Sequence, residues 1–142
     1  MSSGCLFCRI VAGEEHAELV GEDELTLSFM DAFPAANGHL LVIPKAHIET
    51  IYDLEQPHAV AVWRTTIAMA HAIRKALEPD GLTLRQANGA LGGQHIMHLH
   101  VHLIPRYGGG DRGDPGRTAE FAERIRAACD DPARGRSRRG SR

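Results

Sequence analysis

Three histidines alternate with apolar residues in the run His98-Leu-His-Val-His-Leu-Ile104. Side chains of a β-strand point alternately to its two faces, and each residue advances the strand by about 3.3 Å. A strand over residues 96–104, ended by Pro105, would therefore place the three imidazoles on one face, about 6–7 Å apart. The opposite face would supply the core through Met97, Leu99, Val101 and Leu103. The run thus requires a sheet with one packed side and one histidine-bearing side.

A row of imidazoles suits two kinds of chemistry. Two histidines at positions i and i+2 of a strand can share a zinc ion. Neutral imidazole is also a good nucleophile near pH 7, and its neighbours can donate hydrogen bonds to phosphate oxygens. The Gly-rich segment 88–94 just before the run adds backbone N–H groups suited to phosphate. A solvent-facing strand without function is disfavoured, because three crowded imidazoles titrate together and cost stability as they become charged.

Hydrophobic periodicity along the rest of the chain predicts an α+β domain on an antiparallel sheet of roughly four to five strands. The predicted strands cover residues 25–31, 39–43, 82–87 and 96–104. The predicted helices are a short turn over 4–13, a long helix over 57–77 and an amphipathic helix over 117–128. The long helix is expected to bury one stripe, formed by Val60, Trp63, Ile67, Ala70, Ile73 and Leu77.

Composition excludes several classes of protein. With 142 residues, 43% hydrophobic and 24% charged, the chain fits one globular domain. It has no apolar run near the roughly 20 residues of a membrane helix and no export signal, so we expect a cytoplasmic location and no membrane partner. A net charge of −2 argues against a generally basic binder of nucleic acid. Residues 1–129 are predicted as the domain and the Arg-rich residues 130–142 as a disordered tail, with weak binding to RNA or another anionic surface as the alternative.

Cys5 and Cys8 form a second candidate site, a Cys-x-x-Cys pair. Two thiolates at this spacing can hold one side of a tetrahedral zinc ion, which needs two further ligands. Two reduced core cysteines are an alternative interpretation, since free cysteine is often buried. Redox use of the pair is a weaker one, because redox pairs of this spacing normally open a helix after a strand.

With its flanks, the histidine run resembles the signature of the histidine triad (HIT) superfamily, in which three histidines alternate with apolar residues. Gly93-Gln94 precedes the run and Ile104-Pro-Arg106 follows it, as in bacterial members of that family. The segments 6–10, 29–31 and 37–47 resemble the family's other sequence blocks, so the resemblance covers about residues 4–107. It implies a HIT-like fold, with a roughly five-stranded antiparallel sheet, one long helix and short flanking helices. It also implies a homodimer whose two sheets join.

The resemblance further implies a nucleotide hydrolase or nucleotidyl transferase that cleaves purine nucleotide conjugates at the α-phosphorus. Adenosine phosphoramidates and dinucleoside polyphosphates are substrates in the family. His100 matches the nucleophile, which would form a nucleotidyl-histidine intermediate that water resolves to a nucleoside monophosphate. His102 would donate to the phosphate oxygens or help protonate the leaving group.

The remaining site residues also follow from the resemblance. Asp31 would bind the ribose hydroxyls, and Asn88 and Gln94 would contact the phosphate or the leaving group. His39 would support the site from behind. The implied base pocket is lined by Leu6, Phe7, Ile10 and Phe29.

The sequence departs from the family pattern at the edges of the site. His95 stands where many nucleoside phosphoramidases carry a small hydroxyl residue, and it either enters the site as an extra acid or lies on its rim. Glu15 and His16 replace an apolar residue and a proline beside the base pocket. These positions bear on the preferences for leaving group and base.

The resemblance also completes the cysteine site. In a zinc-containing subset of bacterial HIT proteins, a histidine of the second block and the first triad histidine join the cysteine pair. His47 and His98 occupy those places here, which implies one structural Zn²⁺ per chain held by Cys5, Cys8, His47 and His98. Two rival functions stay open: a nucleotide-binding regulatory dimer with little turnover, and a metalloenzyme whose triad itself holds a catalytic zinc.

Overall fold

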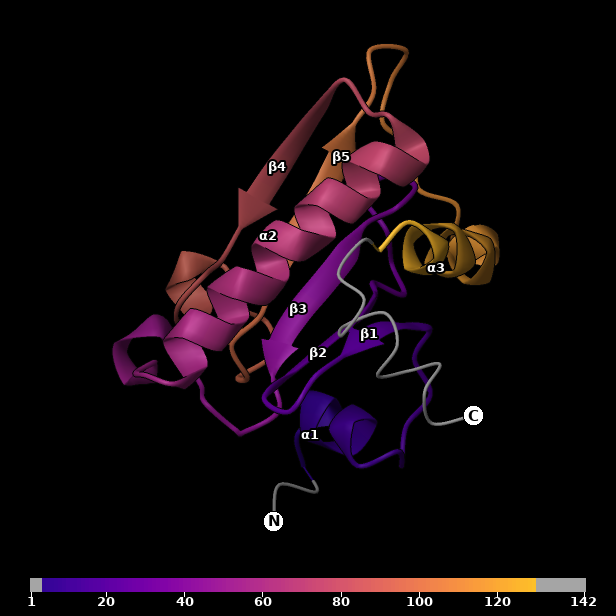
Figure 1. The fold of residues 1–142 in the computed structure, drawn as a ribbon. Coiled ribbons are helices and arrows are strands. Elements are labelled where there is room, and N and C mark those ends of the chain that lie inside the picture. Colours follow the sequence, from indigo (N-terminus) through magenta and orange to yellow (C-terminus); the bar gives the residue numbers. More distant parts are fainter. Residues whose placement is uncertain (1–3, 130–142) are drawn as a thin grey trace.

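The computed structural model describes residues 4–129, so the predicted tail at 130–142 lies outside the described part. The principal elements run along the chain as drawn in Figure 1. They are α1 (Leu6–Val11), β1 (Leu19–Glu22), β2 (Thr26–Met30), β3 (Leu40–Pro44), α2 (His58–Leu77), β4 (Gly81–Arg85), β5 (Val101–Arg106) and α3 (Thr118–Ala127).

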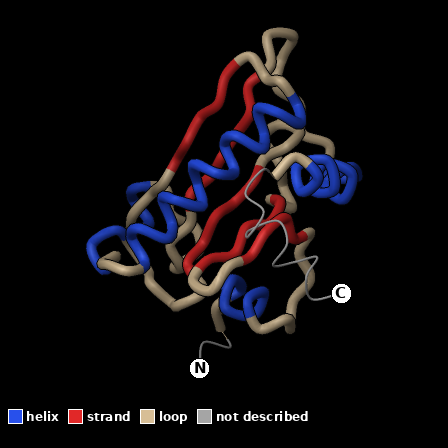
Figure 2. Tube along the Cα trace, viewed as in Figure 1, coloured by secondary structure: helices blue, strands red, loops and turns tan. Residues whose placement is uncertain are grey.

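The five strands form one sheet in the order β1-β2-β3-β5-β4, and every neighbouring pair is antiparallel. The long helix α2 lies across this sheet (Figure 2). This arrangement confirms the predicted α+β fold, with a five-stranded antiparallel sheet, one long helix and short flanking helices. It also makes β4 an edge strand.

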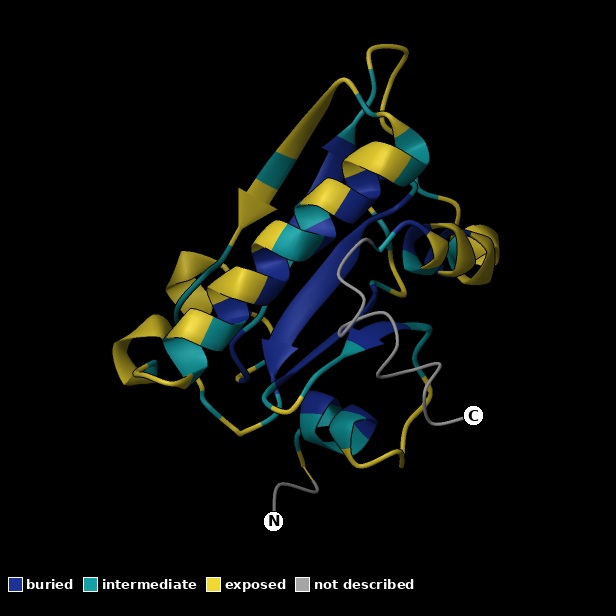
Figure 3. Cartoon of the chain, in the orientation of Figure 1, coloured by how far each residue is buried: buried dark blue, intermediate teal, exposed yellow. Residues whose placement is uncertain are grey.

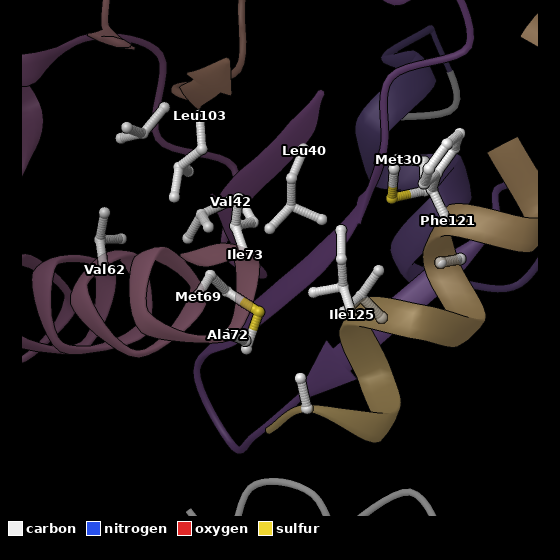
Figure 4. Packing of buried hydrophobic residues seen from close by; sticks show 14 of the residues in the cluster. Met30, Leu40, Val42, Val62, Met69, Ala72, Ile73, Leu103, Phe121 and Ile125 are labelled. Atoms are coloured by element: carbon white, nitrogen blue, oxygen red, sulfur yellow. The ribbon is translucent and has the colours of Figure 1, made fainter. Parts of the chain in front are cut away.

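Both faces of the central strands are packed. Leu40 and Val42 of β3 point toward α2 and α3, where the larger core lies (Figure 4). Leu41 and Ile43 point to the other face, where they pack with Phe7 of α1. Because every residue of β2 and β3 is buried, these strands show no alternation between buried and exposed positions.

The strand boundaries differ from the prediction around the histidine run. The ladder of β5 begins at Val101 rather than Ile96, and Met97 is exposed rather than part of the core. Pro105 lies inside β5 instead of ending it. It is tolerated because β3 pairs with β5 only as far as Leu103, so no ladder on that side is interrupted. The short strand β1 was not predicted.

The predicted stripe of α2 was wrong at its N-terminal half. The residues that α2 buries are Val62, Thr65, Thr66, Met69, Ala72 and Ile73. Val60, Trp63 and Ile67 are instead about half exposed, at 44%, 47% and 56%. The threonines can face the sheet because Thr65 Oγ1 lies 2.8 Å from Thr26 Oγ1 and Thr66 Oγ1 donates to the Val62 carbonyl. The helix therefore carries two apolar sides, of which only one meets its own sheet.

Within residues 4–129, none of the helices combines the length and the apolar character that crossing a bilayer demands.

Candidate active site

A cleft of about 440 Å³ opens on the α1 side of the sheet. Its apolar end is formed by Leu6, Phe7 and Ile10 of α1 together with Phe29 and Leu41 of the sheet. Its polar end is formed by Asp31, Arg85, His95, His100 and His102. The structure therefore brings seven of the predicted site residues to one cleft: Leu6, Phe7, Ile10, Phe29, Asp31, His100 and His102.

One row of paired residues crosses the floor of this cleft from strand to strand. Phe29 of β2 pairs with Leu41 of β3, which pairs with His102 of β5, which pairs with Arg85 of β4. Directly paired residues of an antiparallel sheet project from the same face, with Cβ atoms about 5 Å apart. The cleft thus changes from aromatic to imidazole to guanidinium across the sheet.

Asn88 and Gln94 lie beside this cleft without lining it. Gln94 is 2% exposed, and its amide accepts from Gly89 N at 2.7 Å and donates to the carbonyls of Glu49 and Ile96. Asn88 Oδ1 accepts from Ile51 N at 2.7 Å. The side-chain amides of Asn88 and Gln94 therefore hold the Gly-rich loop in place through hydrogen bonds to the backbone.

The tautomer of His100 is set by a backbone carbonyl. Its Nδ1 donates to the His98 carbonyl at 2.8 Å, so the neutral ring carries its lone pair on Nε2. Phe7 meets the ring edge-on at 5.1 Å. Burial lowers the pKa of His100, only partly opposed by this hydrogen bond and by Asp31. The ring is consequently uncharged near pH 7, as a nucleophile must be.

A second hydrogen-bonded chain sets the tautomer of His102. Ala35 N donates to His39 Nδ1 at 3.0 Å, so neutral His39 carries its proton on Nε2. That atom lies 2.9 Å from His102 Nδ1 and 3.3 Å from Asp31 Oδ2. His102 Nδ1 accepts the hydrogen bond from this N–H, so the N–H of neutral His102 is on Nε2.

Burial also keeps His39 and His102 uncharged. It lowers the pKa of His102 to about 3, with added repulsion from His100 and His39. Burial lowers the pKa of His39 as well, and the Asp31 carboxylate opposes that shift. His102 is therefore a neutral hydrogen-bond donor at physiological pH.

His98 belongs to a different cluster. Phe7 of α1 contacts the rings of both His98 and His100. The strand β5 begins only at Val101, so His98 precedes the regular strand, and its side chain is fully buried. Its Nε2 donates to the Pro44 carbonyl at 2.8 Å, which leaves the lone pair on Nδ1. Nδ1 lies 3.4 Å from Cys5 Sγ and 3.5 Å from Cys8 Sγ.

The four predicted metal ligands converge around this atom. His47 Nδ1 lies 3.2 Å from Cys8 Sγ, and the donor atoms of Cys5, Cys8, His47 and His98 all lie within 4.8 Å of one another. Two sulfur and two imidazole donors are a set that tetrahedral zinc favours, and a carbonyl holding the far nitrogen of a ligating histidine is typical of such sites. Burial raises the pKa of the Cys5 thiol, and a bound cation would reverse that shift. The cluster can hold a metal ion.

The triad does not gather around one ion. Among the described residues, the other group with metal-ligand spacing is Asp31, His39 and His102, which does not include His100. His39 Nε2 lies 2.9 Å from His102 Nδ1 and 3.3 Å from Asp31 Oδ2, so these three side chains belong to the hydrogen-bonded group that orients His102. The rival in which the triad itself holds a catalytic zinc gains no support from this geometry.

The positions that depart from the family pattern lie at the cleft. His95 is exposed and lines the polar end, while Glu15 and His16 line the cleft elsewhere. Arg85 was not predicted as a site residue. Its place depends on the pairing of β4 with β5, and no local pattern in the sequence signals that register.

Comparisons with known proteins show which family this chain resembles in sequence. A family model described as HIT domain matches residues 12–109. The Bacillus subtilis protein named Protein hit is 43% identical over 110 residues, which are 78% of this chain and 76% of that protein. Arabidopsis thaliana adenylylsulfatase HINT3 is 36% identical (75% of this chain, 54% of that protein). Schizosaccharomyces pombe adenosine 5′-monophosphoramidase hnt1 is 32% identical (72% and 74%).

Solved structures show the same likeness. A Hit-like protein from Bartonella henselae superposes with a TM-score of 0.82 at 35% identity, covering 89% of this chain and 98% of that one. A Zn-bound histidine triad family protein from Mycobacterium smegmatis superposes with a TM-score of 0.81 at 31% identity, covering 91% and 95%.

Proposed function

The chain belongs to the HIT domain family, and from this premise we propose that it hydrolyses purine nucleotide conjugates at the α-phosphorus through a nucleotidyl-histidine on His100. The observation that carries the proposal is the uncharged His100 ring, whose Nδ1 is held by the His98 carbonyl so that Nε2 keeps its lone pair in the cleft. An imidazole fixed in this way is ready to attack phosphorus without first losing a proton.

The nucleoside occupies the apolar end of the cleft. Phe7 and Phe29, whose rings meet edge-on at 5.4 Å, flank the base together with Leu6 and Ile10. Asp31 accepts from the ribose hydroxyls with the lone pairs left over from its bond to Phe33 N. Asn88 and Gln94 act on the phosphate indirectly, by holding the Gly-rich loop.

Two displacements complete the reaction. His100 Nε2 forms a bond to the α-phosphorus as the bond to the leaving group breaks and its electron pair departs with that group. His102 donates from Nε2–H to a phosphate oxygen or to the leaving atom, while His39 maintains its tautomer. Water then attacks the same phosphorus, releases the nucleoside monophosphate and restores His100.

Adenylyl conjugates are the substrate class that the named relatives support. One relative is named an adenylylsulfatase and another an adenosine 5′-monophosphoramidase. These names share the adenylyl group and differ in the leaving group.

The metal cluster is proposed to hold one structural Zn²⁺ through Cys5, Cys8, His47 and His98. The Zn-bound family member from Mycobacterium smegmatis supports this choice of metal. A zinc ion here would tie α1 to the strand of the nucleophile, because His98 contributes a ligand atom and also the carbonyl that holds His100. Reduced thiolates of this kind persist in the cytoplasm, where we place the protein.

We also propose that two copies pair through β4 and the outward side of α2. Leu82 and Leu84 of this edge strand are exposed, and so are Val60, Trp63 and Ile67 of α2 (Figure 3). An edge strand offers unpaired backbone groups to a second strand. A second copy supplies both a matching strand edge and a matching apolar helix side.

The catalytic proposal is tested by mass spectrometry of intact protein mixed briefly with adenosine 5′-phosphoramidate or with diadenosine tetraphosphate. Wild type is expected to release AMP and to carry a transient adenylyl adduct, and His100→Ala to lose at least about 10³-fold in rate. His71→Ala, at an exposed histidine of α2, serves as the control and keeps wild-type rates. If neither substrate turns over while AMP still binds, the regulatory-dimer alternative replaces this proposal.

A further inference from the structure

Arg85 is the cation at the polar end of the cleft. Of the residues of the described chain that line the cleft, it is the one arginine or lysine, against the carboxylates of Glu15, Glu18 and Asp31. A substrate with several phosphate charges therefore has one guanidinium to meet in this cleft.

Among the residues that the structure describes, no partner holds the Arg85 guanidinium. Arg85 is exposed, and no hydrogen bond or ion pair joins it to any residue within the described range 4–129. Arg106 on the neighbouring strand differs, since it donates to Thr83 Oγ1 at 3.0 Å and to Asp111 Oδ2 at 2.8 Å. Arg85 is available to an anion that enters the cleft.

The order of strands places Arg85 beyond the reacting phosphorus. Phe29 on β2 marks the base end, His102 on β5 marks the α-phosphorus, and Arg85 lies one strand further, on β4. Neighbouring strands are about 4.8 Å apart, which a phosphate chain spans readily. The row across the sheet therefore follows the order along a substrate: base, α-phosphorus, leaving group.

We propose that Arg85 binds the anionic chain attached to the α-phosphorus, and that it directs the site toward conjugates whose leaving group is a polyphosphate rather than an amine. This inference rests on the proposed function and adds to it the class of leaving group. His95, which lines the same end, forms the neighbouring wall of the subsite.

The chemistry of the two leaving groups separates them. When His100 Nε2 bonds to phosphorus and the P–O bond breaks, the electron pair remains on the departing polyphosphate, and its negative charge increases. A guanidinium beside that oxygen stabilises the charge with paired N–H donors. When a P–N bond breaks instead, the departing amine needs a proton, and a guanidinium does not supply one.

The test compares kcat/KM for diadenosine tetraphosphate and for adenosine 5′-phosphoramidate. Arg85→Ala is expected to lower the first by about 10- to 100-fold, the range of one charged hydrogen-bonded contact, and to change the second by less than about threefold. Arg85→Lys keeps the positive charge but lacks the planar guanidinium, so its kcat/KM for diadenosine tetraphosphate should lie between those of wild type and Arg85→Ala. Arg112→Ala removes an exposed arginine outside the cleft and should leave both values unchanged.

A binding measurement tests Arg85 independently of turnover. Arg85→Ala should weaken ATP binding by about tenfold or more and leave AMP binding unchanged, because only ATP has phosphates beyond the first. Equal losses for both substrates, or equal affinities for ATP in wild type and Arg85→Ala, would overturn the inference. Failure of the proposed function has a different signature, in which wild type and His100→Ala both release no AMP.

Discussion

At the scale of single residues, backbone groups decide which nitrogen of each site histidine carries the proton. Carbonyls of His98 and Pro44 hold the far side of His100 and His98, and the Ala35 amide holds His39. The same sequence motif consequently yields three different chemical groups. In the proposed function, the lone pair of His100 serves phosphorus, the N–H of His102 serves an oxygen, and the lone pair of His98 serves a metal ion.

Neutral buried histidines make stability depend on pH. Below the ordinary histidine pKa of 6.5 the unfolded chain binds protons that native His102, with a pKa of about 3, does not. The free energy of unfolding should therefore fall as the pH drops below about 6.5, by up to about 1.4 kcal/mol per pH unit for each such histidine. Urea unfolding at pH values between about 8 and 5 would measure this slope.

The slope can be assigned with two variants. His102→Asn should flatten it, because asparagine does not titrate, whereas His71→Asn, at an exposed position, should preserve it. An identical slope in wild type and His102→Asn would contradict the prediction.

The sequence predicted the residues of the site better than their individual partners. The motifs indicated the alternating histidines, the cysteine pair and the aromatic residues. The structure brings Phe7 and Phe29 together with His100 and His102 at the cleft, and the cysteine pair together with His47 and His98. Arg85 was not predicted as a site residue, and the bonds of Gln94 to the backbone were not foreseen. Their roles depend on contacts with Glu49 and with β5, which lie far away in the sequence.

At the scale of elements, α1 has the least independent support. It is six residues long, and Cys5 Sγ accepts from Cys8 N at its start. An isolated helix of this length is unstable in water. The position of α1 therefore depends on the packing of Phe7 and Ile10 against the sheet. It also depends on the contacts of Cys5 and Cys8 with His98 and His47.

Cys8→Ser is expected to remove the zinc and destabilise the fold. Metal analysis should find about one zinc per chain in wild type and much less in the variant. The free energy of unfolding should fall by about 4 kcal/mol if zinc is present at a thousandfold excess over its Kd. Cys129→Ser, outside the cluster, should leave the zinc content unchanged. If chelation abolished activity without lowering Tm, the zinc would be catalytic and the structural assignment wrong.

The long helix was predictable from its period, but the side that it buries against the sheet was not. The period of α2 was recognised, but two apolar sides share that period, and only tertiary packing shows that Thr65 and Thr66 face the sheet. The strand β1 was missed because its four residues, Leu-Val-Gly-Glu, carry little pattern and pair with β2 through an irregular register.

At the scale of the whole molecule, the sheet ends at β4 with apolar side chains still exposed. Leu84 is 44% exposed and Trp63 of α2 is 47% exposed, on a surface that Figure 3 marks as accessible. Scattered exposed apolar residues are ordinary, but a row that continues from a helix onto a bare strand edge is the basis for the proposed pairing of two copies.

Trp63→Glu is expected to dissociate the proposed dimer. A charge buried without a partner costs about 3–5 kcal/mol, which corresponds to at least a hundredfold weaker association. Sedimentation analysis would compare it with wild type and with Leu91→Glu, which changes a fully exposed leucine of the Gly-rich loop. Monomeric wild type, or equal dissociation of both variants, would count against this interface.

Alternate residues of the five-residue strand β4 face two different surfaces, the cleft and the proposed dimer interface. Thr83 and Arg85 belong to the cleft side, while Leu82 and Leu84 belong to the side of α2 and the proposed partner. A mutagenesis library restricted to positions 83 and 85 could therefore retune the choice of leaving group while subunit pairing stays intact. A library at 82 and 84 would do the reverse, so each trait can be engineered or lost by drift without the other.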